Sequence, residues 1–196
     1  MKDNRELRAL ARSQLHGSWL AAVGLVLVYG IILGISVLVV VGPIILGGPL
    51  ALGFLGYFSR KARGEQAKLG NLFDGFKLLG KSLSLFLLKG IFLALWSCLF
   101  IIPGIVKSLS YSMAFFILRD NPNIKATEAI TRSRKMMNGN KGKLFGLYLS
   151  FIGWGILCIL SLGIGFLWLI PYINLSVANF YEGLKQNQST RRNTEF

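Results

Sequence analysis

The residues of this 196-residue chain that could do catalytic or metal chemistry are few and scattered. The one histidine, His16, lies far from both cysteines, Cys98 and Cys158, and each cysteine lies inside a long apolar stretch. A zinc site needs three or four converging nitrogen, sulfur or oxygen ligands, which this set does not supply. We find no nucleophile paired with a base and no GxGxxG or Walker phosphate-binding pattern. The sequence therefore predicts a protein that is not an enzyme and has no metal or cofactor.

The first candidate binding residue is Lys107, which lies in an apolar stretch four residues after Pro103. A charge in hydrocarbon is unfavourable unless it is paired, hydrated or able to reach the membrane surface. In one interpretation, the Lys107 side chain extends to that surface along its aliphatic stem. In the other, Lys107 and Tyr111 share an internal cavity with Asn174 and Asn179, and the lysine attracts a lipid phosphate or a carboxylate. The sequence leaves both interpretations open.

A second group of candidates lies on a basic amphipathic helix that we predict between Lys125 and Gly139. Pro122 ends the preceding helix, and Asn123 is placed to cap the new one. The small and apolar face of the helix comprises Ala126, Ala129, Ile130, Ser133, Met136 and Met137. The basic residues expected near anionic lipid headgroups are Arg132, Arg134, Lys135, Lys141 and Lys143. We expect this helix to lie flat on the membrane, where it binds lipid or a partner, or only connects two spans.

The elements that must position these residues are membrane helices. Charged residues make up 15% of the chain, against about 25% in soluble domains, which excludes a compact water-soluble domain. A membrane-crossing helix needs roughly 20 apolar residues. The uncharged stretches predict an all-α protein with six transmembrane helices in three hairpins, at residues 18–41, 42–58, 81–103, 104–118, 144–160 and 166–181. Gly42-Pro43 and Gly47-Gly48-Pro49 are predicted to break the helix of the first hairpin. The second and fourth stretches are short enough to be re-entrant or strongly tilted.

The distribution of basic residues predicts the orientation in the membrane. All but two of the 22 lysines and arginines lie in the N-terminal arm, the two long connecting segments and the tail, and none lies in the turns near Gly42, Pro103 and Gly163. Basic segments stay in the cytoplasm, so both termini are predicted there. The net charge of +14 is therefore interpreted as an orientation signal and not as a nucleic-acid-binding surface. The first apolar stretch exceeds the roughly 7–15 residues of a signal-peptide core, which predicts a retained span.

The chain also has an approximate internal repeat. The three turns without basic residues recur about every 60 residues, which predicts units at residues 4–63, 69–120 and 123–184 of a single membrane domain. A basic amphipathic segment precedes each hairpin. The aromatic pairs that close the hairpins are Tyr57-Phe58, Phe115-Phe116 and Phe180-Tyr181. Residues 185–196 are expected to form a short flexible tail.

Short motifs along most of the chain carry a family resemblance. They include Ile102-Pro103-Gly104, Asp120-Asn121-Pro122, Met137-Asn138-Gly139, Pro171-Tyr172 and Phe180-Tyr181-Glu182. The chain resembles an uncharacterised bacterial family of multi-pass membrane proteins, domain of unknown function 975. It is more distantly similar to the membrane module of some glycerophosphodiester phosphodiesterases. The resemblance implies a protein of the bacterial cytoplasmic membrane and brings no established activity or catalytic residues.

Three functions fit these observations. The favoured one is a non-catalytic scaffold or accessory factor that contacts anionic lipid, because the predicted spans contain no acidic residue of the kind that proton-coupled pumps use. The alternatives are a small transporter or channel for an anionic solute and a module that assists lipid-headgroup metabolism. Gly30 and Gly34 form a GxxxG motif that serves close helix packing, either within the chain or against a second copy or another membrane protein.

The distribution of basic residues leads to a testable topology. Single cysteines introduced near Lys68 and Asn138 are expected to be shielded from a membrane-impermeant thiol reagent in intact cells. Cysteines near Gly47 and Gly163 are expected to react, because the positive-inside rule places those turns outside. External labelling near Asn138 would contradict this orientation.

Overall fold

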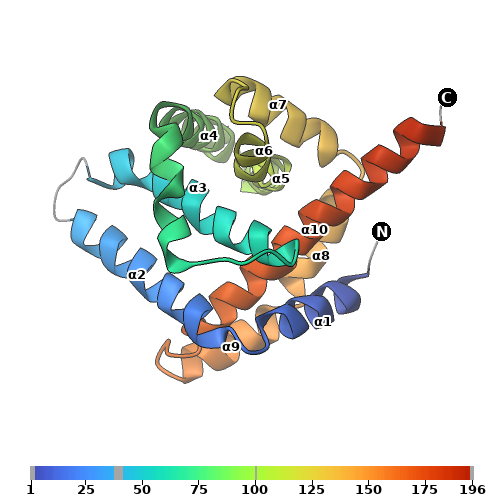
Figure 1. Ribbon diagram of the computed structural model, residues 1–196. Coiled ribbons are helices and arrows are strands. Elements are labelled where there is room, and N and C mark those ends of the chain that lie inside the picture. The colour runs from blue at the N-terminus through green and yellow to red at the C-terminus, as the bar shows by residue number, and fades with distance from the viewer. Residues whose placement is uncertain (1–2, 38–41, 100, 195–196) are drawn as a thin grey trace.

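The computed structural model describes residues 3–37, 42–99 and 101–194, and these residues form only helices and turns. The helices are α1 Asn4–Leu15, α2 Trp19–Val37, α3 Gly42–Ala62, the 3-10 helix η1 Leu69–Leu78, α4 Leu79–Leu99, α5 Ile101–Tyr111, α6 Ala114–Asp120, α7 Ala126–Met136, α8 Lys141–Leu149, α9 Ile152–Leu160 and α10 Phe166–Thr194. In Figure 1, α3 and α10 run through the middle of the molecule, with α1 and α2 on one side and α4 to α7 on another. The all-α prediction is confirmed at this level.

The apolar helices at the periphery are those suited to a membrane. Two stretches, Leu69–Leu95 and Lys141–Leu160, are long and apolar enough to cross a bilayer. The bent pair of α1 and α2, with an angle of 96° between its helices, makes a third if it counts as one span. The outer helices α2, α4 and α9 expose large apolar side chains such as Ile31, Ile91 and Ile159, where a water-soluble protein would carry polar ones. These features are consistent with a membrane protein, whereas the six predicted spans stay a prediction.

The central helices form a core rich in aromatic side chains. All three predicted aromatic pairs are buried. Phe116 of α6 stacks on Tyr181 of α10 with their ring centroids 5.2 Å apart, and Phe54 of α3 packs edge-on against Phe58 at 5.1 Å. Each such aromatic pair contributes roughly 0.5–1.5 kcal/mol beyond the area that it buries. The aromatic pairs that mark the predicted ends of the hairpins therefore lie near the end of α3, at the start of α6 and in the middle of α10.

The predicted break at Gly47-Gly48-Pro49 is wrong, because α3 continues through it with Pro49 inside the helix. The glycines of α3 instead allow close contact with η1 and α4. A Cβ atom at Gly48 would lie 2.6 Å from the carbonyl oxygen of Ser82, and one at Gly53 would collide with the carbonyl oxygen of Leu72. Small residues let helix backbones approach in this way. The predicted turn before Gly42 falls on residues 38–41, outside the described residues.

The predicted amphipathic segments correspond to α1, η1 and α7. The predicted apolar face of α7 is buried in full, but it packs against α4, α5 and α6, so these residues contact protein. Gly139 ends this region with a positive φ of 75°, as expected. The N-cap is Lys125 and not Asn123, which corrects the predicted cap. The middle segment is a 3-10 helix while the others are α-helices, and the 60-residue repeat stays a prediction.

Two helix breaks and one extension were not apparent in the sequence. The predicted fourth stretch divides into α5 and α6, and the fifth divides into α8 and α9. At the second break, Arg8 Nη1 of α1 donates to the freed carbonyl oxygen of Ser150 at 3.2 Å.

The turn predicted at residues 161–165 is present, with positive φ angles at Leu162 and Gly163. Helix α10 continues to Thr194, through residues that the sequence analysis assigns to a flexible tail.

The close approach of α3 and η1 makes a testable prediction. Gly53→Ala is expected to lower the free energy of unfolding by about 1–3 kcal/mol, because its Cβ would force the backbone at Leu72 to move. Gly34→Ala is the matched control, since a Cβ there has no neighbour within 4 Å. Thermal unfolding of both variants in the same detergent tests this, and equal melting temperatures would contradict the packing role of Gly53.

Candidate anion-binding groove

A groove of about 410 Å³ lies between α5, α7 and the start of α8. Four cationic side chains line it, those of Lys107, Arg134, Lys135 and Lys141. The other lining residues are Ser110, Thr131 and Asn138, which are all polar. The structure therefore brings residues from separate parts of the sequence into one basic depression, which we call the basic groove.

Two local features position the walls of the basic groove. The buried hydroxyl of Ser133 donates to the carbonyl oxygen of Ser110 at 2.7 Å, which fixes α7 against α5. Lys107 is one helical turn before Ser110, so this contact sets its place relative to Arg134. At the other end, Gly139 has a φ of 75° and reverses the chain into α8, which brings Lys141 back to the groove. Glycine adopts this left-handed conformation without the strain that a Cβ introduces.

The electrostatic character of the basic groove is uniformly positive, because none of its described lining residues is acidic. Lysine and arginine side chains at this density bind anions with distributed charge, such as phosphate and carboxylate, through charge-assisted hydrogen bonds. The hydroxyls and the Asn138 amide add neutral donors. The basic groove is therefore chemically suited to an anionic group and offers no nucleophile and base for catalysis.

The sequence-predicted candidates divide between this groove and other places. Lys107, Arg134 and Lys135 line it. Arg132 points elsewhere on α7 and forms an ion pair with Glu128 at 2.6 Å, with about half of each side chain exposed. The remaining candidates are Tyr111, Asn174 and Asn179.

These three residues have partners of their own. Tyr111 is buried, and its ring centroid lies 6.2 Å from that of Phe92 in α4. The Asn174 amide donates to the carbonyl oxygen of Ile170 within α10. The Asn179 amide donates to Oε1 of Gln14 in α1 at 2.8 Å. None of the three lines the basic groove with Lys107, and the internal cavity that was one interpretation of Lys107 stays a prediction.

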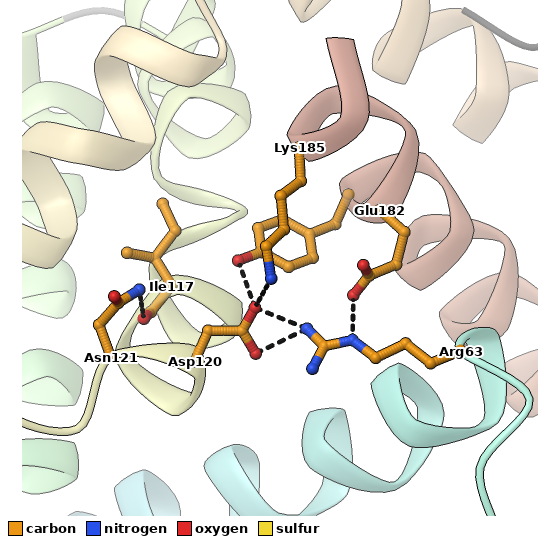
Figure 2. Close-up of polar contacts among 7 residues, drawn as sticks. Arg63, Ile117, Asp120, Asn121, Glu182 and Lys185 are labelled. Carbon is orange, nitrogen blue, oxygen red and sulfur yellow. Dashed lines mark hydrogen bonds and ion pairs between the residues drawn. The ribbon is translucent and has the colours of Figure 1, made fainter. Parts of the chain in front are cut away.

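An ion-pair cluster around Asp120 joins the end of α3, the end of α6 and the middle of α10 (Figure 2). Arg63, just after α3, contacts both carboxylate oxygens of Asp120 at 2.6 and 2.7 Å, and its Nε donates to Glu182 of α10 at 2.6 Å. Lys185 Nζ and the Tyr181 hydroxyl, both on α10, donate to Oδ2 of Asp120 at 2.8 and 3.1 Å. The Asp120 side chain is only 7% exposed. The carboxylate therefore holds the C-terminal ends of α3 and α6 against the middle of α10.

The charges in this cluster stabilise each other. Burial by itself raises the pKa of Asp120, but the hydrogen bonds from Arg63 and Lys185 outweigh it, so the pKa lies below its ordinary value. For Arg63, burial lowers the pKa, but the hydrogen bonds to Asp120 and Glu182 raise it by more. The net pKa is therefore above its ordinary value. Each group is thus held in its charged form.

Sequence reasoning missed the partners in this cluster. Asp120 and Glu182 lie in the motifs that carry the family resemblance, so their motif positions were the available signal. Arg63 had no such signal, because it is one of several basic residues in a connecting segment. Ser110, Thr131 and Asn138 of the basic groove were also missed, since their roles depend on how α5 and α7 pack.

Within the described part of the chain, no three histidine, cysteine, aspartate or glutamate side chains come together as a metal site would require. Cys158 is buried and free, close to Gly165. The Cys98 side chain lies outside the described side chains.

The comparisons with known proteins give a family but no activity. Residues 1–109 and 99–188 match the model of a family described as "Protein of unknown function (DUF975)". No curated protein and no solved structure gives a significant match to the chain. The family match includes the first predicted hairpin.

The Asp120 cluster predicts a pH-dependent contribution to stability. At neutral pH, Asp120→Asn is expected to lower the free energy of unfolding by about 2 kcal/mol, between the values for exposed and buried pairs. Because the folded-state pKa of Asp120 is lowered, this contribution is present above the ordinary aspartate pKa and is lost as the pH falls through the folded value. The melting temperatures of wild type and variant should therefore converge in acid.

The matched control is Glu128→Gln, which breaks the exposed pair with Arg132 and should change stability by less than about 0.5 kcal/mol. A constant difference between wild type and Asp120→Asn from neutral to acidic pH would contradict the role assigned to the ionised carboxylate.

Proposed function

Because the chain belongs to the DUF975 family, whose function is unknown, we propose a function from the site itself. The protein is a non-catalytic scaffold or accessory factor of the bacterial cytoplasmic membrane, and it holds an anionic lipid headgroup in the basic groove. The observation that carries this proposal is the combination of four cations with exposed apolar side chains beside them.

The apolar surroundings favour a lipid over a soluble anion. Ile105 and Val106 precede Lys107 on α5, and both are exposed. On α8, the exposed Phe145 is one turn after Lys141 and on the same face. A lipid offers a charged headgroup to the cations and an acyl chain to the apolar residues, whereas a free anion would leave the apolar residues in water. This pairing of charge and apolar surface supports a phospholipid with a net negative headgroup.

The proposed orientation places the α7 and α8 residues of the basic groove, Arg134, Lys135 and Lys141, on the cytoplasmic side. Lys107 reaches the same groove because the fourth stretch, which contains α5, is re-entrant in this proposal. The helices α2 with α3, α4 with α5 and α6, and α8 and α9 with α10 serve as the three membrane hairpins, with both termini inside. The positive-inside distribution supports this arrangement. Inner leaflets carry the anionic lipids that attract such basic residues.

The alternatives are less well supported by the contacts. A transporter needs a polar path, but Tyr111, Asn174 and Asn179 are engaged with residues of other helices or of their own. The distant sequence similarity to the membrane module of glycerophosphodiester phosphodiesterases fits a module that assists lipid-headgroup metabolism. In that alternative, the basic groove would hold a headgroup for a separate enzyme.

The proposal predicts that stability depends on the lipid headgroup. The purified protein in phosphatidylglycerol nanodiscs is expected to melt at a higher temperature than in phosphatidylcholine nanodiscs with the same acyl chains. The triple variant Arg134→Gln, Lys135→Gln and Lys141→Gln should lose most of this gain, because each basic residue near an anionic surface contributes roughly 1 kcal/mol. The gain should also decrease with added salt.

Arg132→Gln is the matched control, because Arg132 is on the same helix and lies outside the basic groove. It should retain the difference between the two lipids. An equal response of the triple variant and Arg132→Gln, or equal melting temperatures of the wild type in both lipids, would contradict lipid binding in the basic groove.

A further inference from the structure

A second basic pocket lies next to the Asp120 cluster, between α3, η1, α6 and α10, with a volume of about 540 Å³. We propose that this pocket, which we call the arginine pocket, binds a phosphate-bearing anion through Arg119, with Arg60 and Arg63 beside it. Its helices differ from those of the basic groove. The proposal is therefore independent of the lipid function argued above.

The first observation is that one guanidinium nitrogen of Arg119 has no hydrogen-bond partner. Arg119 lines the arginine pocket, and its Nη1 atom is buried without a hydrogen-bond partner. A buried polar donor that lacks an acceptor destabilises a protein, because it has lost its hydrogen bonds to water without replacing them. The side chain packs against Gly56 of α3, where a Cβ atom would lie 3.3 Å from Arg119 Nε. Glycine at this position thus leaves room for the guanidinium at the pocket wall.

The charge balance of the arginine pocket is the second observation. Five cationic side chains line it, those of Arg60, Arg63, Lys77, Arg119 and Lys185, against the two carboxylates of Asp74 and Asp120. Both carboxylates are already shared: Asp74 pairs with Arg60 and Lys77, and Asp120 pairs with Arg63 and Lys185. No acidic lining residue is thus left over for Arg119 among those described. An anion in the arginine pocket would supply the missing acceptor.

The environment of Arg119 explains why an anion would bind there. Burial lowers the pKa of Arg119, and the nearby positive charges of Arg63 and Arg60 lower it further, while the carboxylates of Asp120 and Glu65 offset part of this effect. A doubly charged phosphate would relieve this repulsion and accept hydrogen bonds from several donors at once. Arginine recognises phosphate through two parallel N–H groups, which a lysine cannot provide. Inorganic phosphate, a soluble phosphate ester and a phospholipid headgroup share this chemistry.

The experiment separates these sources of phosphate. The purified protein in detergent is titrated with inorganic phosphate, and with sodium chloride at matched ionic strength, while thermal unfolding is followed. In a second arm, the protein is placed in nanodiscs with and without phosphatidylglycerol in phosphate-free buffer. A ligand that binds only the folded state raises the melting temperature. A phosphate-specific rise in the first arm supports a soluble ligand, and a rise in the second arm that depends on Arg119 supports a headgroup.

Arg119→Gln is expected to weaken phosphate binding roughly tenfold or more, because it removes charge-assisted hydrogen bonds. Without phosphate it should be at least as stable as the wild type, since it removes a buried donor without a partner. A purely structural arginine would give the opposite result. Arg119→Lys keeps the charge, provides a second folded variant and should bind phosphate several-fold more weakly than the wild type.

The control is Lys135→Gln in the basic groove, which should leave the inorganic phosphate response unchanged. An unchanged phosphate response in both Arg119 variants would overturn the proposal, and so would a wild type that responds to neither inorganic phosphate nor phosphatidylglycerol. If Lys135→Gln abolished the inorganic phosphate response while the Arg119 variants retained it, the anion would bind in the basic groove and the arginine pocket would be excluded.

Discussion

The carboxylate of Asp120 joins three parts of the chain that are far apart in sequence. It accepts hydrogen bonds from Arg63 after α3 and from Lys185 and Tyr181 on α10, and it ends α6. Because its side chain is almost fully buried, these charged contacts are less screened than surface pairs. The stacked rings of Phe116 and Tyr181 pack next to it. The packing of the C-terminal ends of α3 and α6 against the middle of α10 therefore depends on one charged junction, beside which the arginine pocket lies.

This junction also determines where positive charge remains available. The chain has 22 basic and 8 acidic residues, and Asp74, Asp120 and Glu182 are engaged in ion pairs inside the fold. Few acids are then left to neutralise the other basic side chains. Among the described residues, the basic groove and the arginine pocket are places where the fold concentrates this surplus. The helices of the groove also carry exposed apolar residues such as Ile105 and Phe145, and the arginine pocket lies beside the ion pairs.

The sequence predicted the helical class and the small and apolar face of α7, because both depend on local periodicity or on apolar composition. It placed that face on the membrane, whereas the face packs against α4, α5 and α6. It failed at Gly47-Gly48-Pro49, since a glycine and proline cluster looks the same whether it breaks a helix or allows another backbone to approach. It also did not predict the contacts of Arg63 and Arg119. Such contacts depend on tertiary packing between helices, which one sequence does not encode in any local pattern.

Asp120 and Arg63 should be energetically coupled across the junction of α3, α6 and α10. A double-mutant cycle with Asp120→Asn, Arg63→Gln and the combined variant measures this coupling from unfolding free energies in detergent. We expect a coupling of about 1–3 kcal/mol for this largely buried pair, against less than about 0.5 kcal/mol for the exposed pair of Glu128 and Arg132. Equal couplings for the two pairs, or additive effects of the Asp120 and Arg63 substitutions, would show that this ion pair does not hold α3, α6 and α10 together.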